Sequence, residues 1–229
     1  MTTISLKGAL AGMGNADNGY KSDAFNHFRE LIPQFQERVQ AQYADAPETM
    51  SGQSSAVNPN SADVLIPAFL SAYTTGAGSS LDIFPAITRL LPNWTVKYAG
   101  LMKLIPWLGD NLKSFNINHT YKSIYAVGAY NSYSSFMECM GEWGFISNVT
   151  TGNPIPSSMY NVSTVSINES FSPLIGVDMA FNSGLTAGIK YNKTRALNLS
   201  MTSVALTESF SNDIVVDLGY KVKDLNLFG

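Results

Sequence analysis

The chain has 229 residues and a formal net charge of -3, so it offers no excess of positive charge for a nucleic-acid partner. Charged residues make up only 14% of the sequence, against about 25% in a typical soluble domain, whereas 45% of the residues are hydrophobic. The uncharged run 64–81 is interrupted by Pro67 and by several Gly, Ser and Thr, which excludes it as a transmembrane helix. Outer-membrane β-barrels have such an intermediate composition, because half of each strand faces lipid and half faces a polar lumen.

The first segments of the chain predict a short strand followed by a helix. Residues 4–10 alternate between apolar and polar side chains and lead into the turn-forming sequence NADNG. Residues 25–39 place apolar side chains at helical spacing, with Ser22 or Asp23 as the N-cap. Pro33 is expected to kink this helix or to start a second one.

A polar loop and a mixed segment come next. Residues 45–63 are polar, and residues 64–91 combine short apolar pieces with Gly and Pro. Neither segment has the alternation of a strand. Residues 20–91 are therefore expected to form a helical and irregular extramembrane insertion, within one very large barrel to which all of residues 1–229 belong.

Strand patterns return at residue 93. Residues 94–98 alternate, and residues 115–129 alternate over more than the roughly 9–11 residues that a transmembrane strand needs. Residues 131–160 carry loop signals from Gly and Pro. Together with the last third of the chain, the pattern predicts about seven strands.

Residues 173–191 show two alternating segments joined by the turn sequence Asn-Ser-Gly. Large apolar side chains share one face of each segment, and Gly, Thr, Asp or Lys occupy the other. The polar face is poor in charge, which suits an aqueous lumen better than the charged exterior of a soluble sandwich. The predicted fold class is therefore mainly all-β, an antiparallel transmembrane β-barrel segment with a small helical and irregular extramembrane excursion.

The alternation also assigns individual side chains to lipid or to the lumen. The predicted lipid-facing residues are Ile175, Val177, Met179, Phe181, Leu185, Ile189, Leu197, Leu199, Ile214, Val216 and Leu218. The predicted lumen-facing residues are Asp178, Thr186, Lys190, Asp217 and Lys221. Aromatic residues near strand ends are expected at the two membrane interfaces, namely Trp94, Tyr98, Tyr121, Tyr191 and Tyr220.

No motif in the sequence predicts catalysis or cofactor binding. Gly12 and Gly14 follow a predicted strand but lack the third glycine of a dinucleotide fingerprint. His27 and His119 are the two histidines and are far apart, and Cys139 has no histidine beside it to activate a thiolate. We therefore expect no enzymatic activity, no catalytic residue, no metal and no cofactor.

Five stretches of the sequence resemble the C-terminal region of a known family. They are NSADVLIPAFLSAY, LPNWTVKYAGL, SFNINHTYKSIYAVGAYNSY, ESFSPLIGVDMAF and LTAGIKYNKTRALNLSMTSVALTES. In this order they resemble the SprA/Sov family, the outer-membrane translocons of the type IX secretion system, which many Bacteroidota also need for gliding motility. The resemblance covers nearly the whole chain.

The resemblance implies a very large single-chain β-barrel in the cell outer membrane of a Gram-negative, Bacteroidota-like bacterium. Its implied partners are secreted cargo proteins, a PorV-like outer-membrane protein, a periplasmic plug and membrane lipid, with no nucleic acid. Family members are longer on both sides, so the chain is expected to be a fragment of such a barrel. Two alternatives stay open, a TonB-dependent or porin-like barrel and a soluble β-rich surface or adhesin module.

Overall fold

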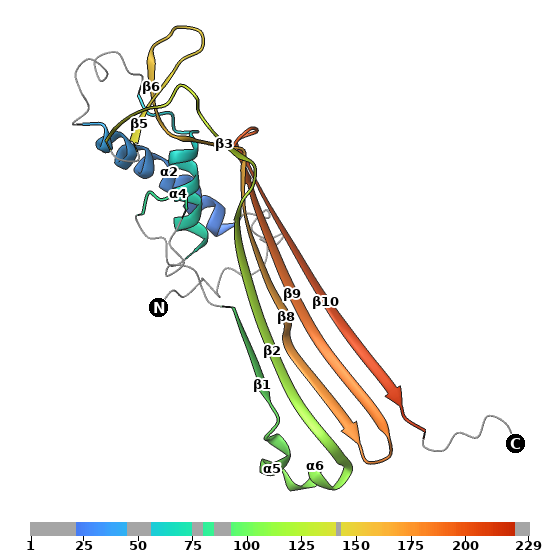
Figure 1. Cartoon of the computed structure of the whole chain (residues 1–229). Helices are drawn as coiled ribbons and strands as arrows, with labels where there is room; N and C mark the ends of the chain where they lie inside the picture. The colour runs from blue at the N-terminus through green and yellow to red at the C-terminus, as the bar shows by residue number, and fades with distance from the viewer. Residues whose placement is uncertain (1–21, 45–55, 75–79, 85–92, 141–142, 223–229) are drawn as a thin grey trace, which may run out of the picture. The chain divides into compact units, whose positions relative to one another are not determined.

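The protein was analysed as a computed structural model, which describes residues 22–44, 56–74, 80–84, 93–140 and 143–222 (Figure 1). The strand predicted at residues 4–10 and the turn after it lie outside the described residues. The described helices are α2 (Asp23–Gln42), α4 (Ala62–Tyr73), α5 (Leu101–Leu104) and α6 (Pro106–Asn111). None of them is long and apolar enough to cross a membrane.

Strands dominate the described part of the chain. They are β1 (Trp94–Tyr98), β2 (Leu112–Val127), β3 (Tyr130–Ser132), β4 (Met137–Met140), β5 (Trp143–Ser147), β6 (Pro154–Ser158), β7 (Tyr160–Val162), β8 (Thr164–Phe181), β9 (Leu185–Ser200) and β10 (Ala205–Tyr220). The largest sheet has five strands in the order β1-β2-β8-β9-β10 (Figure 1). The prediction of a mainly antiparallel β protein with few helices is confirmed.

The chain divides into two compact units. Unit 1 takes in Met1–Leu91, Tyr125–Ile167 and Leu197–Glu208, and unit 2 takes in Pro92–Ile124, Asn168–Ala196 and Ser209–Gly229. Strands β2, β8, β9 and β10 each contribute residues to both units. The insertion predicted at 20–91 therefore supplies the helices of unit 1, but strand residues complete that unit.

The core of unit 1 forms between α2 and α4. Helix α2 buries one stripe of apolar side chains at helical spacing, whereas α4 is buried on nearly all sides. The rings of Phe28 and Phe69 meet edge to face with their centroids 6.3 Å apart. Six strand side chains belong to the same buried cluster: Phe145, Val162, Val165, Ile167, Leu197 and Leu199.

The prediction that Leu197 and Leu199 face lipid is wrong. Their exposed fractions are 0% and 2%, and both lie in the core of unit 1. Alternation correctly separates them from the polar face of β9, but it cannot tell which part of an apolar face another element covers. Helices α2 and α4 supply that cover.

Helix α2 begins as predicted but does not break at Pro33. The Ser22 hydroxyl accepts a hydrogen bond from the Phe25 backbone N–H at 3.3 Å, which confirms Ser22 as the N-cap. The helix then runs unbroken through Pro33 to Gln42, so the expected second helix start is wrong. Pro33 lies on the exposed side of α2. The burial of the apolar side chains on the opposite side stabilises the helix by more than the loss of the backbone hydrogen bond that proline cannot donate.

The segment predicted as loop at 131–160 contains five short strands or parts of them. Strands β3 and β7 pair with each other, and β4, β5 and β6 form a three-stranded sheet. The described residues thus include ten strands where about seven were predicted. Pro154 and Pro156 hid β6 from a pattern search, yet β6 is an outer strand of its sheet, where proline is tolerated.

The long strands are joined by two tight turns. Residues 182–184 join β8 to β9 as predicted, and Gly184 has a φ of +92°, which only glycine adopts without strain. Residues 201–204 join β9 to β10, and there Val204 has a φ of 50° although it is β-branched. Val204 therefore holds a strained backbone conformation.

We expect Val204→Gly to stabilise the protein by about 1 kcal/mol, because it relieves the left-handed strain and removes a side chain that is 48% exposed. The measurement is the midpoint of urea unfolding in detergent micelles. Val204→Ala keeps the Cβ and is the control, with a smaller gain expected. A lower midpoint for the glycine variant would contradict the expectation.

Candidate functional site

The sheet of unit 2 has one apolar face that no described part of unit 2 covers. Trp94 stacks on Tyr121 at 4.4 Å between ring centroids, and Val96 pairs with His119, so alternate residues of β1 and β2 share this face. On β10 the apolar face is exposed to solvent from Ile214 to Tyr220. The most exposed apolar side chains of this face are Ile175 of β8, at 60%, and four residues of β10, namely Ile214 at 69%, Val216 at 60%, Leu218 at 76% and Tyr220 at 67%.

Six predicted lipid-facing residues are exposed in the structure. They are Ile175, Leu185, Ile189, Ile214, Val216 and Leu218. Val177, Met179 and Phe181 lie in the same alternation of β8 and are half-buried. Contiguous apolar exposure of this kind is rare on water-soluble monomers and marks a surface that contacts lipid or another protein.

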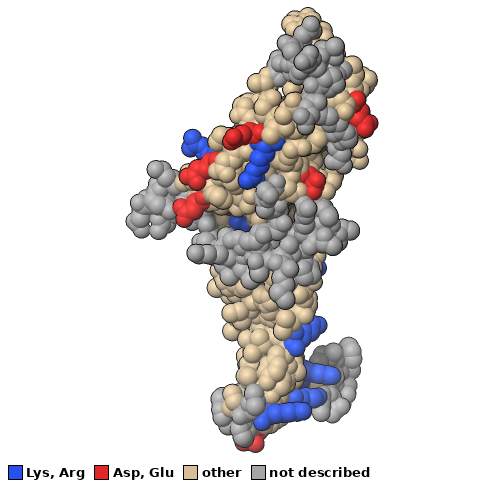
Figure 2. All heavy atoms as spheres, turned by 90° about the vertical axis from the view of Figure 1, so that its left-hand side faces the viewer, with Lys and Arg blue, Asp and Glu red and all other residues tan. Residues whose placement is uncertain are grey.

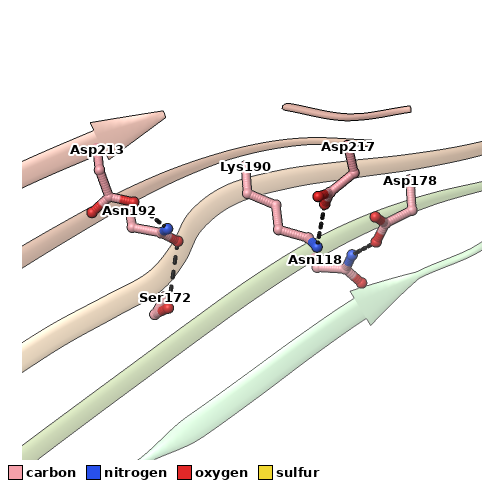
Figure 3. A network of polar contacts seen from close by, with 7 residues as sticks. All are labelled: Asn118, Ser172, Asp178, Lys190, Asn192, Asp213 and Asp217. Atoms are coloured by element: carbon pink, nitrogen blue, oxygen red, sulfur yellow. Dashed lines mark hydrogen bonds and ion pairs between the residues drawn. The ribbon is translucent and has the colours of Figure 1, made fainter. Parts of the chain in front are cut away.

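The opposite face of the sheet carries a network of polar side chains (Figure 3). Asn118 donates a hydrogen bond from Nδ2 to Asp178, and Lys190 Nζ lies 3.0 Å from Asp217 Oδ2. Asn192 Nδ2 donates to Asp213 Oδ2 at 2.7 Å. The network therefore crosses from β2 through β8 and β9 to β10 on one side of the sheet.

The predicted lumen-facing residues lie on this polar side. Asp178, Lys190 and Asp217 belong to the network, and Thr186 donates from Oγ1 to the Gly219 carbonyl at 3.1 Å. Lys221 follows the last residue of β10, and its backbone N–H donates to the Gly184 carbonyl at 2.9 Å. Asn118, Asn192 and Asp213 were not predicted, although each stands one residue from an apolar-face position.

Glycines on the polar side make room for these side chains. A Cβ at Gly188 would lie 3.1 Å from Asp178 Oδ1 and 3.5 Å from the Cβ of Asp217. Gly188 thus lies between two carboxylates of neighbouring strands. Its lack of a side chain lets the polar groups of β8 and β10 approach β9.

We expect Gly188→Val to destabilise the protein by about 1–2 kcal/mol, because the added side chain displaces Asp178 and Asp217. This is opposite to the usual preference of a strand for valine over glycine. Ala187→Val on the apolar side of the same strand is the matched control and should be neutral. The midpoints of urea unfolding in detergent give both values, and equal midpoints for the two variants would contradict the expectation.

A cluster of aromatic rings borders the apolar face. Tyr121 contacts Trp94 and Phe171, with ring centroids 4.4 and 4.8 Å apart, and His119 lies 5.9 Å from Phe171. The His119 ring is held by a 2.6 Å contact between Nδ1 and the Leu174 carbonyl. Tyr98 and Tyr220 stand at the far ends of their strands, with exposed fractions of 43% and 67%. Tyr98 and Tyr220 therefore expose aromatic rings on the apolar face, whereas Tyr121 and Phe171 are buried, with exposed fractions of 0% and 2%.

Next to the aromatic cluster lies an ion pair that the sequence analysis missed. Arg195 donates from Nε to Glu169 Oε2 at 2.7 Å, and Tyr121 donates from its hydroxyl to Glu169 Oε1 at 3.0 Å. The Arg195 and Glu169 side chains are only 3% and 1% exposed. The available signal was a Glu and an Arg at apolar-face positions of adjacent strands, a combination that requires pairing.

One end of unit 2 is marked by tight connections and lysines. The Asn182 backbone N–H donates to the Asn111 carbonyl at 3.0 Å, so the β8–β9 turn meets the α6–β2 connection. Exposed lysines lie on α5, at the start of β2 and after β10, namely Lys103, Lys113 and Lys221. Figure 2 shows Lys and Arg side chains gathered at this end, beside a stretch of surface with few charges.

The two histidines and the cysteine, which could bind a metal or act as a nucleophile, all lie in the described residues. Within the described residues, no group of three His, Cys, Asp or Glu side chains is placed to hold a metal ion. Cys139 lies in β4, where burial and then the neighbouring Glu138 raise the pKa of its thiol. Its sulfur contacts the Trp143 carbonyl at 3.7 Å. A raised pKa makes Cys139 a weaker nucleophile at neutral pH.

Neither the comparison with models of protein families nor the comparison with curated proteins gave a match to this chain.

Proposed function

We propose that the sheet of unit 2 is part of the wall of an outer-membrane β-barrel, with its apolar face toward lipid and its polar face toward an aqueous lumen. The observation that carries the proposal is the two-sided sheet. One face exposes large apolar side chains, and the other holds Asn, Asp and Lys side chains that pair across neighbouring strands. In the wall of a barrel the apolar face would contact lipid and the polar face would contact the water of the lumen.

Strand length supports a membrane position. Strands β8, β9 and β10 have 18, 16 and 16 residues, and a tilted strand needs roughly 9–11 residues to cross the hydrocarbon. The strands are longer than this, and their additional residues belong to unit 1, where Leu197 and Leu199, for example, pack against helices. The part of β10 from Phe210 to Tyr220 carries the exposed apolar side chains and has the length required to cross.

The outer strands of the sheet support a wall that continues on both sides. Strands β1 and β10 stand at the two ends of the strand order. Backbone N–H and C=O groups on their outer sides would have no partner in hydrocarbon, where each such group costs several kcal/mol. A membrane position therefore requires further strands beside β1 and β10.

The connections between strands indicate an orientation. Residues 182–184 form a tight turn at one end of the sheet. Residues 201–204 form another at the opposite end, but the long connection 128–163, which holds five short strands between β2 and β8, lies at that opposite end too. Bacterial outer-membrane barrels have short turns on the periplasmic side and longer loops outside the cell. The proposal therefore places the 182–184 turn in the periplasm and residues 128–163 at the cell surface.

Within this class we propose a protein-conducting translocon of the SprA/Sov kind, on the strength of the five resembling stretches. Its work is passive, because a wide polar lumen lets a folded client pass while the closed backbone ladder excludes lipid. Secreted cargo, a PorV-like outer-membrane protein and a periplasmic plug are the partners that this proposal includes.

Deletion of the gene that encodes this chain tests the translocon proposal. We expect secreted proteins to accumulate in the periplasm and to disappear from the medium, while other outer-membrane proteins keep their normal abundance. A plasmid copy should restore secretion. An unchanged set of secreted proteins, with a loss of small-solute uptake instead, would favour a porin-like or TonB-dependent barrel and would contradict a protein-conducting role.

A further inference from the structure

Unit 1 contains a pocket that the proposed transport role does not use. It has a volume of about 450 Å³, within the range of roughly 300–1,000 Å³ that small-ligand sites occupy. It lies among the start of α4, the segment 81–84, and strands β4, β5 and β6. Every lining residue belongs to unit 1.

One of the lining side chains is a buried carboxylate with an unsatisfied oxygen. Asp63 is 5% exposed, and its Oδ2 accepts a hydrogen bond from the Ser158 backbone N–H at 3.0 Å. Its Oδ1 is buried and has no hydrogen-bond partner among the described residues. A buried acceptor without a partner is costly, so in a native protein such an atom calls for a partner, which is an ordered water, an ion or a group of a ligand.

Among the described residues, no positively charged group offsets the burial of the Asp63 carboxyl. Burial raises the pKa of the Asp63 carboxyl above its ordinary value, and the Ser158 hydrogen bonds oppose that shift only in part. The negative charge of Asp63 in turn helps to raise the pKa of the Tyr133 hydroxyl, after the larger effect of burial. A cation beside Oδ1 would stabilise the ionised carboxylate and supply the missing hydrogen bond at once.

The walls and the rim of the pocket also favour a cation. Phe84, Trp143 and Tyr160 present aromatic rings to it, and the rings of Phe84 and Tyr160 meet edge to face at 5.5 Å. Asp82 and Glu138 line the pocket with exposed carboxylates, and no Lys, Arg or His is among the described residues that line it. Aromatic faces attract cations, and the acidic rim concentrates them.

We propose that this pocket binds the guanidinium group of an arginine, with Asp63 Oδ1 as its deepest contact and the aromatic side chains as its walls. Guanidinium fits better than ammonium because it is planar, stacks on aromatic rings, and sheds water more readily on burial. The arginine comes either from a segment of a partner polypeptide or from a free arginine-like molecule. Both sources present the same chemistry to Asp63.

Calorimetric titration of the purified full chain in detergent tests this site. The probe is N-acetyl-arginine methylamide, and the matched control is the citrulline analogue, which has nearly the same shape but no charge. We expect the arginine probe to bind and the citrulline probe to bind at least about tenfold more weakly, because the citrulline analogue lacks the positive charge that would face the Asp63 carboxylate. A pentapeptide with a central arginine that binds more tightly than the single residue indicates a polypeptide source, and equal affinity indicates a small molecule.

Two variants locate the binding at Asp63. Asp63→Asn keeps the acceptor for the Ser158 N–H and is expected to stay folded while it loses about tenfold in affinity for the arginine probe. Glu37→Gln removes an exposed carboxylate of α2 in the same unit and should leave the affinity unchanged. Glu138→Gln at the exposed rim, where folding is not at risk, should weaken binding by a smaller factor.

Three results would overturn the proposal. These are the absence of binding by the arginine probe, equal binding of the citrulline analogue or of N-acetyl-lysine methylamide as a second control, and unchanged affinity in both Asp63→Asn and Glu138→Gln. The transport role does not enter any of these measurements, so a failure of one proposal leaves the other standing.

Discussion

Val216→Lys is expected to prevent or strongly reduce assembly of the protein in the outer membrane. Val216 lies on the apolar face near the middle of the exposed part of β10, and its side chain is 60% exposed. An ammonium group at the midplane of the hydrocarbon costs roughly 2–4 kcal/mol. The measurements are the abundance of the protein in the outer-membrane fraction and the heat resistance of its folded band on a gel.

Val215→Lys is the matched control for this change. It alters the same residue type one position earlier on the same strand, where the side chain is 38% exposed and points to the side of Asp213 and Asp217. A lysine there adds a hydrated charge beside two carboxylates, so we expect normal assembly. If water bathed both faces, the two variants would behave alike, and that outcome would contradict a lipid-facing sheet.

Glu169→Gln should have the second large effect, a loss of about 3–5 kcal/mol in the free energy of unfolding. The change preserves the shape of the side chain and an acceptor for the Tyr121 hydroxyl, but it removes the carboxylate that faces the buried Arg195 guanidinium. Chemical denaturation of the detergent-solubilised protein measures the loss.

Two comparisons separate the effect of burial from that of charge alone. Asp217→Asn breaks the Lys190–Asp217 pair, whose side chains are 36% and 58% exposed, and should cost no more than about 1 kcal/mol. The double variant Glu169→Met/Arg195→Met removes both buried charges and should recover most of the stability that Glu169→Gln loses. Equal losses for Asp217→Asn and Glu169→Gln would show that burial does not strengthen the ion pair.

The alternation of apolar and polar residues predicted the structure best in strands that have one apolar and one polar face. The two-residue period of a strand predicts the β8–β9 hairpin and places Ile175 and Asp178 on opposite faces. The need for a positive φ predicts the turn at 182–184, which ends at Gly184. Both signals are local, so they can be recognised without knowledge of the rest of the fold.

The features that were missed depend on contacts between distant parts of the chain. Leu197 continues the apolar face of β9, yet helices more than a hundred residues earlier in the sequence cover it. Glu169 and Arg195 are 26 positions apart, and only strand pairing brings them together. Asp63 and Ser158 line the same pocket and share a hydrogen bond, although they are 95 positions apart. No local pattern contains these distances.

Thiol labelling tests the central claim, that the sheet of unit 2 separates lipid from an aqueous lumen. Cys139 is the one native cysteine, so a Cys139→Ser background can carry Val215→Cys or Val216→Cys. In intact outer membranes we expect a small hydrophilic maleimide to label Cys at 215 and to leave Cys at 216 unlabelled, whereas both should label after denaturation. Labelling at 216 without labelling at 215, or equal labelling of both in membranes, would contradict the claim.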